Sequence, residues 1–488
     1  MAEESWHVAR LIPTSGISGP DEQERRATSA LLAVMAAVRE FGRSLTSRFG
    51  APAGVVETYI EVPFVLGEAR HYPDGLIRVS RGSRTWTALV EVKTGTNCLQ
   101  AAQLEAYLDI AREQGFDAVL TISNEIPAVA GSHPTTVDKR KVKKVALHHL
   151  SWTQVLTEAV VQKVHRGVAD PDQAWILGEL IRYLEHPKSG AMDFEDMGPA
   201  WVSVRESVAN GTLRASDKSA GEDASRWDQL IRYLCLRLGR QLGTEVQPLL
   251  SRQELAEPAQ RAQTLLQGLV SRGILEGGVK IPNAVGPVVL TADLRAGRVT
   301  CSVDVEAPRE GRPLTRINWL LRQLKNAPDT LRIDAFAQYA RGASTSELLR
   351  DARTNPTLLV GDPKKELRTF RLTLSGPMGS KRGQGRGSFI ASVLEIVDVF
   401  YGQVVQTIKQ TDRPPRMREV SVVPPPTPDV PAALVSTALS SQDGAVPAGR
   451  DAPPSEPAAE ASASEDTETL TSPGAETAEL VADATVTD

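Results

Sequence analysis

Apolar and polar positions in the first 165 residues alternate with two different periods. Apolar residues at helical spacing predict a helix at about 20–41 and a second helix at 103–114. Short apolar runs with strand alternation predict strands at 55–64, 76–80, 87–93 and 118–123. The predicted order is one helix, three strands, one helix and one strand, which indicates an α/β domain over residues 1–165.

The pattern changes twice in the remainder of the chain. Residues 166–285 read as a helical connector, in which a Gly277-Gly278 turn after the apolar run 265–275 indicates a small winged-helix-like element. Residues 286–411 mix strand and helix patterns and predict an α+β domain. From residue 412 to 488, Pro, Ala, Ser, Thr and acidic residues dominate, and this composition predicts a disordered tail.

Charge is distributed unevenly between these segments. Ser421 to Asp488 contain 12 acidic residues and one arginine, a net charge of −11. Because the whole chain has a net charge of −5, residues 1–420 have a net charge of +6. The part with folding patterns is therefore mildly basic, which is compatible with a nucleic-acid partner. The acidic tail reads as a solubilising extension, with competition against DNA for the basic surface as the alternative.

One predicted strand carries charges where apolar residues are expected. In Ala88-Leu-Val-Glu-Val-Lys93, Glu91 and Lys93 are two positions apart and therefore point to the same face of the strand. Charged groups on an otherwise buried strand are costly to desolvate without a function. Asp74, after Pro73, lies where it brings a second carboxylate to the neighbouring strand. Two carboxylates and an ammonium group suit a divalent cation beside a phosphate.

These residues resemble the signature of the PD-(D/E)xK nucleases, and the order of the elements resembles the αβββαβ core of that restriction-endonuclease-like fold. Gln103 and Tyr107 resemble the QxxxY motif of the RecB-type branch. The resemblance covers about the first 160 residues. It implies catalytic roles for Asp74, Glu91 and Lys93, and substrate positioning by Gln103 and Tyr107. An acidic residue on the first helix completes the metal shell in many relatives, which makes Glu24 a further candidate, with Glu57 and Glu61 as alternatives.

The implied chemistry is metal-assisted hydrolysis of phosphodiester bonds. Asp74 and Glu91 would hold Mg²⁺, for which Mn²⁺ can substitute, and Lys93 would orient the attacking water or stabilise charge that develops on the phosphate. No pattern indicates zinc. His148 and His149 are adjacent but would face opposite sides of a strand, which argues against a shared metal.

Two clusters of basic residues are candidates for contacts with nucleic acid. Five cations precede the predicted strand at 145–150, near the expected active-site edge, and three more lie in a glycine-rich loop that precedes a long amphipathic helix at 388–408. A solvated surface loop is the alternative interpretation of each cluster. The residues are Lys139, Arg140, Lys141, Lys143 and Lys144, and Lys381, Arg382 and Arg386.

The sequence thus predicts a Mg²⁺-dependent DNA nuclease, in genome maintenance or in defence against foreign DNA, with RNA open as a substrate. The alternative is a non-catalytic nucleic-acid-binding, scaffold or stress-related regulatory protein that retains the fold. Three isolated cysteines predict a reducing compartment without disulfides. The absence of a signal pattern and of an uninterrupted apolar run near 18 residues predicts a cytoplasmic protein without a membrane span. The pattern leaves the oligomeric state open.

Overall fold

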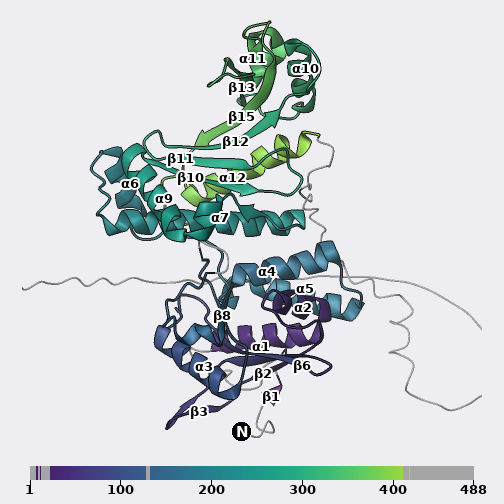
Figure 1. Cartoon of the computed structure of the whole chain (residues 1–488), viewed down its shortest axis with the longest axis vertical. Helices are drawn as coiled ribbons and strands as arrows, with labels where there is room; N and C mark the ends of the chain where they lie inside the picture. Colours follow the sequence, from purple (N-terminus) through teal and green to yellow (C-terminus); the bar gives the residue numbers. More distant parts are fainter. Residues whose placement is uncertain (1–6, 9–10, 12–21, 128–131, 410–416, 418–488) are drawn as a thin grey trace, which may run out of the picture. The chain divides into compact units, whose positions relative to one another are not determined.

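A computed structural model describes residues 7–8, 11, 22–127, 132–409 and 417. These residues form a mixed α/β structure and belong to one compact unit, Met1–Glu419. Two main sheets, each with helices of its own, make up this unit (Figure 1). The predicted tail from residue 412 lies outside the described residues, apart from Met417. The predicted borders at residues 165 and 285 remain predictions.

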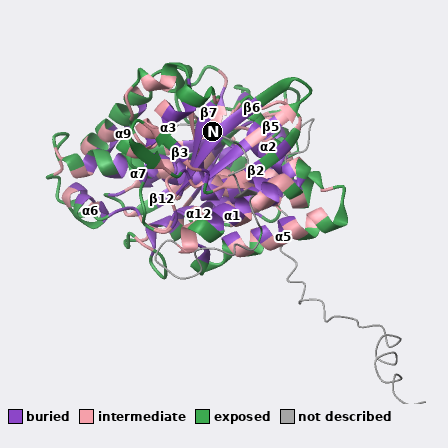
Figure 2. Cartoon of the chain, turned by 90° about the horizontal axis from the view of Figure 1, so that it is seen from below, coloured by how far each residue is buried: buried purple, intermediate pink, exposed green. Residues whose placement is uncertain are grey.

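The first sheet follows the N-terminal pattern. Its strand order is β1-β2-β5-β6-β7-β8, with β2, β5 and β6 antiparallel and β6, β7 and β8 parallel. Strands β5, β6 and β7 are largely buried (Figure 2). The strands are β1 (His7–Val8), β2 (Val55–Ile60), β5 (Gly75–Arg81), β6 (Arg84–Val92), β7 (Ala118–Ser123) and β8 (Ala146–Ser151).

Helices pack on both faces of this sheet. On one face, α1, α2, α4 and α5 enclose an apolar core that includes Leu31, Phe41 and Val90. On the other face, α3 packs Tyr107 and Leu108 against Leu89. The helices are α1 (Glu22–Ala37), α2 (Arg39–Ser47), α3 (Ala101–Gln114), α4 (Trp152–Val160) and α5 (Pro171–Glu185), with a short π-helix at Val161–Arg166.

Two N-terminal elements differ from the prediction. The helix expected at 20–41 is divided at Val38, whose backbone is extended (φ −104°, ψ 95°), and α2 continues to Ser47. This break lets Val38 itself reach the core, where its side chain is fully buried. The strand expected at 55–64 ends at Ile60. Phe64, the last residue of that expected strand, instead begins a separate hairpin of β3 (Phe64–Leu66) and β4 (Ala69–His71), which the pattern did not predict.

The second sheet is antiparallel throughout, in the order β14-β13-β15-β12-β11-β10-β9. Helices α7, α9 and α12 share a large apolar core with it. The strands are β9 (Gln247–Pro248), β10 (Ile274–Lys280), β11 (Val288–Asp293), β12 (Arg298–Glu306), β13 (Arg332–Ala337), β14 (Thr345–Leu348) and β15 (Leu367–Pro377). The helices are α6 (Trp201–Ala209), α7 (Lys218–Leu242), α8 (Arg252–Ala256), α9 (Pro258–Arg272), α10 (Pro313–Gln323), α11 (Leu349–Thr354) and α12 (Phe389–Gln403). Four 3-10 turns, at Lys141–Lys143, Pro187–Ser189, Pro356–Leu359 and Val405–Thr407, complete the described elements.

The predicted Gly277-Gly278 turn is wrong, because both glycines lie inside β10 and pair with β11. A Cβ on Gly277 would lie 2.8 Å from the Ile231 side chain of α7, and one on Gly278 would lie 2.8 Å from the Val288 carbonyl oxygen. These glycines therefore permit close approach of neighbouring elements rather than a reversal of the chain. The winged-helix-like interpretation rested on that turn and loses its support.

One described segment, Phe389–Thr407, is long and apolar enough to cross a membrane, although no uninterrupted apolar run was predicted. Half of it is buried inside the protein, and α12 packs against β12 and β15. The buried side chains of α12, among them Phe389 and Phe400, belong to the core of the second sheet. This apolar character is accounted for by the interior of the fold.

Candidate active site

Asp74 and Glu91 come together at one end of the first sheet. Asp74 immediately precedes β5, and Gly75 pairs with Val90, so Asp74 lies beside Glu91 of the adjacent strand. One carboxylate oxygen of Asp74 accepts a hydrogen bond from the Val92 backbone N–H at 2.7 Å. Glu91 is 1 % exposed, and neither of its oxygens has a hydrogen bond to a described residue. The sequence-predicted pair is therefore brought together, with the Glu91 carboxylate fully buried beside Asp74.

Lys93 connects the carboxylates to the first helix. Its Nζ lies 2.8 Å from Glu91 Oε1, in an ion pair that is not aligned as a hydrogen bond. It also donates a hydrogen bond to Glu24 Oε1 at 2.8 Å. The other Glu24 oxygen lies 3.4 Å from the Thr94 backbone nitrogen. Glu24 thus joins the site, as its position on the first helix predicted, and its contact in this structure is with the lysine.

The packing of these charges shifts their proton affinities. Burial, and then the charge of Glu91, raise the pKa of Asp74 well above its usual value, against the opposing effect of the Val92 N–H. Burial also raises the pKa of Glu91, and Lys93 opposes that shift. Burial alone would lower the pKa of Lys93, but the neighbouring carboxylates outweigh it and raise that pKa. The site therefore favours a bound cation or proton between its carboxylates.

Gln103 and Tyr107 lie one turn apart on α3, as their spacing predicted. Gln103 Nε2 donates a hydrogen bond to the Tyr107 hydroxyl at 3.1 Å, and that hydroxyl lies 3.4 Å from the Tyr72 carbonyl oxygen. Burial, followed by the charge of Glu91, raises the pKa of Tyr107, which keeps its hydroxyl protonated as a donor. This pair forms a polar wall on the α3 side of the carboxylates.

Several residues that support the site carried no recognised signal in the sequence. The Trp152 indole N–H donates to the Lys93 carbonyl oxygen at 2.9 Å and connects α4 to the end of β6. Ser151 begins α4 with a capping box, in which its hydroxyl accepts a hydrogen bond from the Gln154 N–H. On the other side, the Gly95 N–H donates to the Gly190 carbonyl oxygen at 2.9 Å, and Asn124 bridges the same two residues.

A small cavity of about 110 Å³ opens beside Asp74. Arg25, which is exposed, lines it together with Pro73 and Tyr72. The cavity is also lined by Glu61, the alternative acid named from the sequence, which has a positive φ of 53°. Glu57 is exposed on β2. Sequence reasoning did not single out Arg25, because arginine on a helix surface is common.

A cluster of hydrogen bonds lies on β7, next to the strand that carries Glu91. Thr121 pairs with Glu91 in the β6–β7 register, and its hydroxyl lies 2.8 Å from both His133 Nε2 and His149 Nδ1. The Thr135 N–H donates to His133 Nδ1, and His149 Nε2 contacts the Glu125 carbonyl oxygen. Burial lowers the pKa of both rings, which favours their neutral forms. His148 stacks on Phe49 instead, so the two adjacent histidines face opposite sides, as predicted.

We expect the contribution of His149 to the free energy of unfolding to fall as the pH is lowered from about 7 towards 4. Burial lowers the pKa of His149 to about 4, below its ordinary 6.5. The low pKa of His149 stabilises the fold above pH 6.5. As the pH falls from 6.5 towards 4, the unfolded chain binds a proton at this residue and the folded chain does not, so this stabilisation of about 3 kcal/mol is lost. Chemical denaturation at pH 7 and pH 5 measures the difference.

His149→Gln should reduce this pH dependence, because the variant lacks the titrating ring. His186→Gln removes an exposed histidine and should leave the pH dependence as it is in the unaltered chain. An unchanged pH dependence in His149→Gln would contradict the assignment.

The two basic clusters do not converge on the carboxylates. Because β8 runs parallel to β6 and β7, its first residue, Ala146, pairs with Ala118, whereas Glu91 lies at the level of Thr121. Residues 139–144 thus enter β8 at the opposite end of the strands, about 10 Å along the sheet from Glu91. The expectation that this cluster lies at the active-site edge is wrong, because parallel strands place their first residues far from their carboxyl ends.

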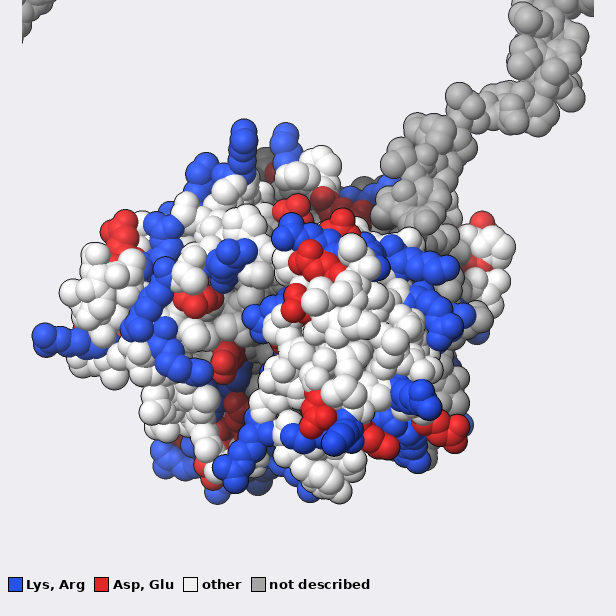
Figure 3. Space-filling view, turned by 90° about the horizontal axis from the view of Figure 1, so that it is seen from above, with Lys and Arg blue, Asp and Glu red and all other residues white. Residues whose placement is uncertain are grey.

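Some of these cations are also neutralised within the fold. Lys141 forms an ion pair with Asp109 at 2.6 Å, Arg140 with Asp138 at 3.1 Å, and Arg382 with Asp196 at 3.4 Å. Lys139, Lys143, Lys144, Lys381 and Arg386 are exposed. Hydrogen bonds between Lys381, Gly387 and Phe389 close the glycine-rich loop, so it is more ordered than predicted. Lys and Arg are spread over the face seen in Figure 3, with Asp and Glu among them.

Asp74 and Glu91 are the residues that could hold a divalent cation. Both offer hard carboxylate oxygens, and Glu91 Oε2 has no hydrogen bond to a described residue, which leaves it available to a ligand. Across the described residues, no group of three or more His, Cys, Asp or Glu side chains is arranged to hold a metal. Water or substrate oxygens would therefore supply the remaining ligands. All three cysteines are free, and only Cys98 is exposed.

No family model, no curated protein and no solved structure matches this chain.

Proposed function

We propose that this chain is a metal-dependent nuclease that hydrolyses phosphodiester bonds in DNA. The observation that carries the proposal is the convergence of Asp74, Glu91 and Lys93 from two neighbouring strands, with Glu91 fully buried beside Asp74 and ion-paired to Lys93. Two carboxylates buried side by side are costly to maintain, so a catalytic or binding role accounts for them better than a structural one.

We infer further that the first sheet is a restriction-endonuclease-like core with a RecB-type QxxxY helix. The strand order β2-β5-β6-β7-β8, antiparallel at one side and parallel at the other, supports this inference. So does the position of Tyr107 on α3, over the face that carries Glu91. The core would place the metal-binding residues at the carboxyl end of β6, where substrate can reach them.

Each residue of the site has a distinct part in the proposed reaction. Asp74 and Glu91 would hold Mg²⁺, or Mn²⁺ in its place, which when bound supplies a more acidic water and neutralises phosphate charge. Lys93 would direct its ammonium group at the attacked phosphate and stabilise the charge that develops there. The Gln103–Tyr107 pair offers donors to the sugar–phosphate backbone, and the exposed Arg25 offers a second cation near Asp74.

We expect purified protein to cut labelled linear, circular or single-stranded DNA with Mg²⁺ or Mn²⁺ and to be inactive in EDTA. Lys93→Ala should lower the rate by roughly a hundredfold to a thousandfold, because it removes a charge that acts on the transition state. A gel assay over time measures the rate, and the cutting of circular DNA distinguishes internal cleavage from attack at ends. A labelled RNA substrate tests the same site on the alternative nucleic acid.

Lys280→Ala is a matched control, since Lys280 is an exposed lysine at the end of β10 in the other sheet. It should cut at the rate of the unaltered chain. Circular dichroism of Lys93→Ala checks that its fold is retained. Absence of metal-dependent cutting in the unaltered chain, with DNA binding intact, would overturn the nuclease proposal and favour a non-catalytic nucleic-acid-binding protein.

A further inference from the structure

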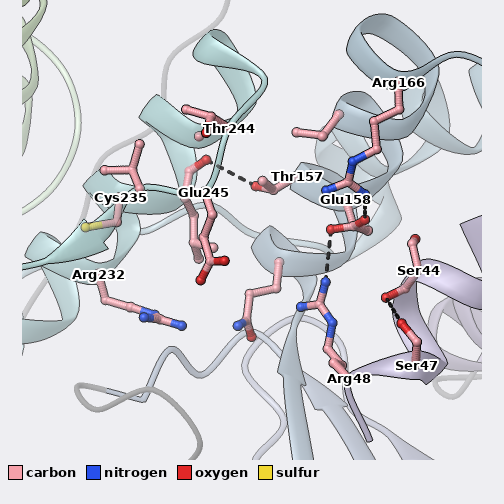
Figure 4. A pocket seen from close by; sticks show the side chains of 15 residues that line it. Ser44, Ser47, Arg48, Thr157, Glu158, Arg166, Arg232, Cys235, Thr244 and Glu245 are labelled. Carbon is pink, nitrogen blue, oxygen red and sulfur yellow. Dashed lines mark hydrogen bonds and ion pairs between the residues drawn. The ribbon is translucent and has the colours of Figure 1, made fainter. Parts of the chain in front are cut away.

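A second polar cavity lies away from the carboxylates, among α2, α4, the π-helix and α7. It has a volume of about 440 Å³, within the range of pockets that bind small molecules. Arg48, Arg166 and Arg232 line it together with Glu158 and Glu245 (Figure 4). Hydroxyl groups complete the wall, from Ser44, Ser47, Thr157 and Thr244. The lining is therefore charged and rich in hydrogen-bonding groups, which does not suit a purely apolar ligand.

Arg232 is the least explained charge in this cavity. Burial lowers its pKa, Cys235 and then Glu245 oppose that shift, and the charge of Arg48 adds to it. It has no hydrogen bond or ion pair with any described residue. Its side chain extends from α7 into the space that Glu245 also faces (Figure 4). A half-buried guanidinium without a partner in the fold can bind an anion that enters the cavity.

The other two arginines are placed by a shared partner. Glu158 pairs with Arg48 at 2.9 Å and with Arg166 at 2.5 Å, so this carboxylate is neutralised from two sides. The remaining lining charges are Arg232 and Glu245. The side chain of Glu245 accepts a long hydrogen bond from Gln247 at 3.3 Å. The cavity thus has one net positive charge, an anion-seeking guanidinium and a carboxylate that can accept further hydrogen bonds.

We propose that this cavity binds a small phosphate ester that also carries hydroxyl groups, such as a sugar phosphate or a nucleoside monophosphate. The phosphate would pair with Arg232, because guanidinium groups bind phosphate oxygens through two parallel hydrogen bonds. Glu245 and the Ser and Thr hydroxyls would accept or donate hydrogen bonds to the hydroxyl groups of the ligand. The proposal is independent of nuclease activity and goes beyond it.

Ligand binding would also connect two hydrophobic cores. Phe41 and Leu45 of α2 and Val155 of α4 belong to the core of the first sheet, whereas Cys235 and Leu238 of α7 belong to the core of the second. A ligand that contacts α2, α4 and α7 together would add a link between elements that otherwise share few polar contacts. One such contact is the Thr157 hydroxyl, which donates to the Leu236 carbonyl oxygen at 3.4 Å.

Isothermal titration of the full chain with ribose 5-phosphate, adenosine 5′-monophosphate, inorganic phosphate and ribose tests the proposal. We expect saturable binding of at least one of the two esters, weaker binding of inorganic phosphate, and none of ribose. Arg232→Met should weaken binding of the ester by roughly tenfold or more, because it removes a charge-assisted hydrogen bond. Arg43→Gln, which changes an exposed arginine of α2 outside the cavity lining, should bind as the unaltered chain does.

A second readout separates a binding role from a structural one. Because Arg232 has no partner in the fold, Arg232→Met should keep or raise the melting temperature of the ligand-free protein, by up to about 3 °C, while ligand-induced stabilisation disappears. Failure of both esters to bind would overturn the proposal. So would equal binding by Arg232→Met and Arg43→Gln, or a marked loss of stability in ligand-free Arg232→Met, which would indicate a structural arginine.

Discussion

Asp74→Asn is expected to abolish cleavage and, in the absence of metal, to stabilise the fold. The change keeps the shape of the side chain and an oxygen that can accept the Val92 N–H. It removes a charge whose pKa is raised by burial first and then by Glu91, so the repulsion between two buried carboxylates is lost. We expect a loss of cleavage rate of roughly a thousandfold or more and a gain of about 1–3 kcal/mol in the free energy of unfolding.

The raised pKa of Asp74 also predicts how the stabilisation by Asp74→Asn depends on pH. A carboxyl group whose pKa is raised in the folded state binds more protons there than in the unfolded chain, so it weakens the fold fully at a pH above its folded pKa. The penalty is relieved as the pH falls through that value towards the ordinary 3.8 of the unfolded chain. The stability difference between Asp74→Asn and the unaltered chain should therefore be largest at neutral pH and shrink in acid.

Asp117→Asn is a matched control for this substitution. The Asp117 side chain also accepts a hydrogen bond from a backbone N–H of β6, that of Thr87, at 2.8 Å. Unlike Asp74, Asp117 is exposed. Denaturant titration in EDTA, with and without added Mg²⁺, gives the free energies of unfolding. We expect no stabilisation in Asp117→Asn, and a stabilisation by Mg²⁺ that is lost in Asp74→Asn. A destabilised Asp74→Asn that still cuts DNA would show that Asp74 is a structural residue.

Arg261→Met is expected to destabilise the protein by about 3–5 kcal/mol, the cost of leaving a buried carboxylate without its partner. Arg261 of α9 and Asp228 of α7 are only 8 % and 9 % exposed, and their side chains form hydrogen bonds of 3.0 and 3.1 Å. Arg261 also donates to the Glu276 carbonyl oxygen at 2.7 Å, which ties both helices to β10. Denaturant titration of the purified variant measures the loss.

Two further variants test the reason for that loss. The double change Arg261→Met with Asp228→Leu should recover most of the stability, because it removes the stranded charge as well as its partner. Arg272→Met removes another arginine of α9, one that pairs with Glu276 at 3.4 Å in an exposed position, and should cost less than about 1 kcal/mol. If Arg272→Met costs as much as Arg261→Met, burial of the ion pair is not the cause.

The residues of the candidate site could be named from the sequence because their chemistry conflicts with their surroundings. Glu91 and Lys93 lie in a strand whose other positions are apolar, and strand alternation alone places them on one face. Gln103 and Tyr107 are one helical turn apart, and the structure joins them by a hydrogen bond. Local periodicity also predicted most of the N-terminal helices and strands to within a few residues.

The remainder could not be predicted because it depends on contacts between distant residues. The interpretation of Gly277 and Gly278 as a turn overlooked α7, whose Ile231 leaves no room for a Cβ in β10. The basic cluster at 139–144 was assigned to the wrong end of the sheet, because sequence order does not say where β8 starts relative to Glu91. Trp152, Gly190 and Arg232 carry no motif, and their roles come from partners at least 59 residues away or from the lack of one.

The sequence by itself determined the local elements and the chemical character of the candidate site, since periodicity and the identity of charged residues are properties of short segments. Only the tertiary structure decided which charges meet. It placed Asp74 beside Glu91 and joined Lys93 to Glu24 by a hydrogen bond. It paired several basic residues that were predicted to contact nucleic acid with acidic residues of the fold, and it left Arg232 without a partner in a cavity. The reason is physical, because the free energy of a charged group depends on its solvent exposure and on neighbours that the folding of distant segments brings to it.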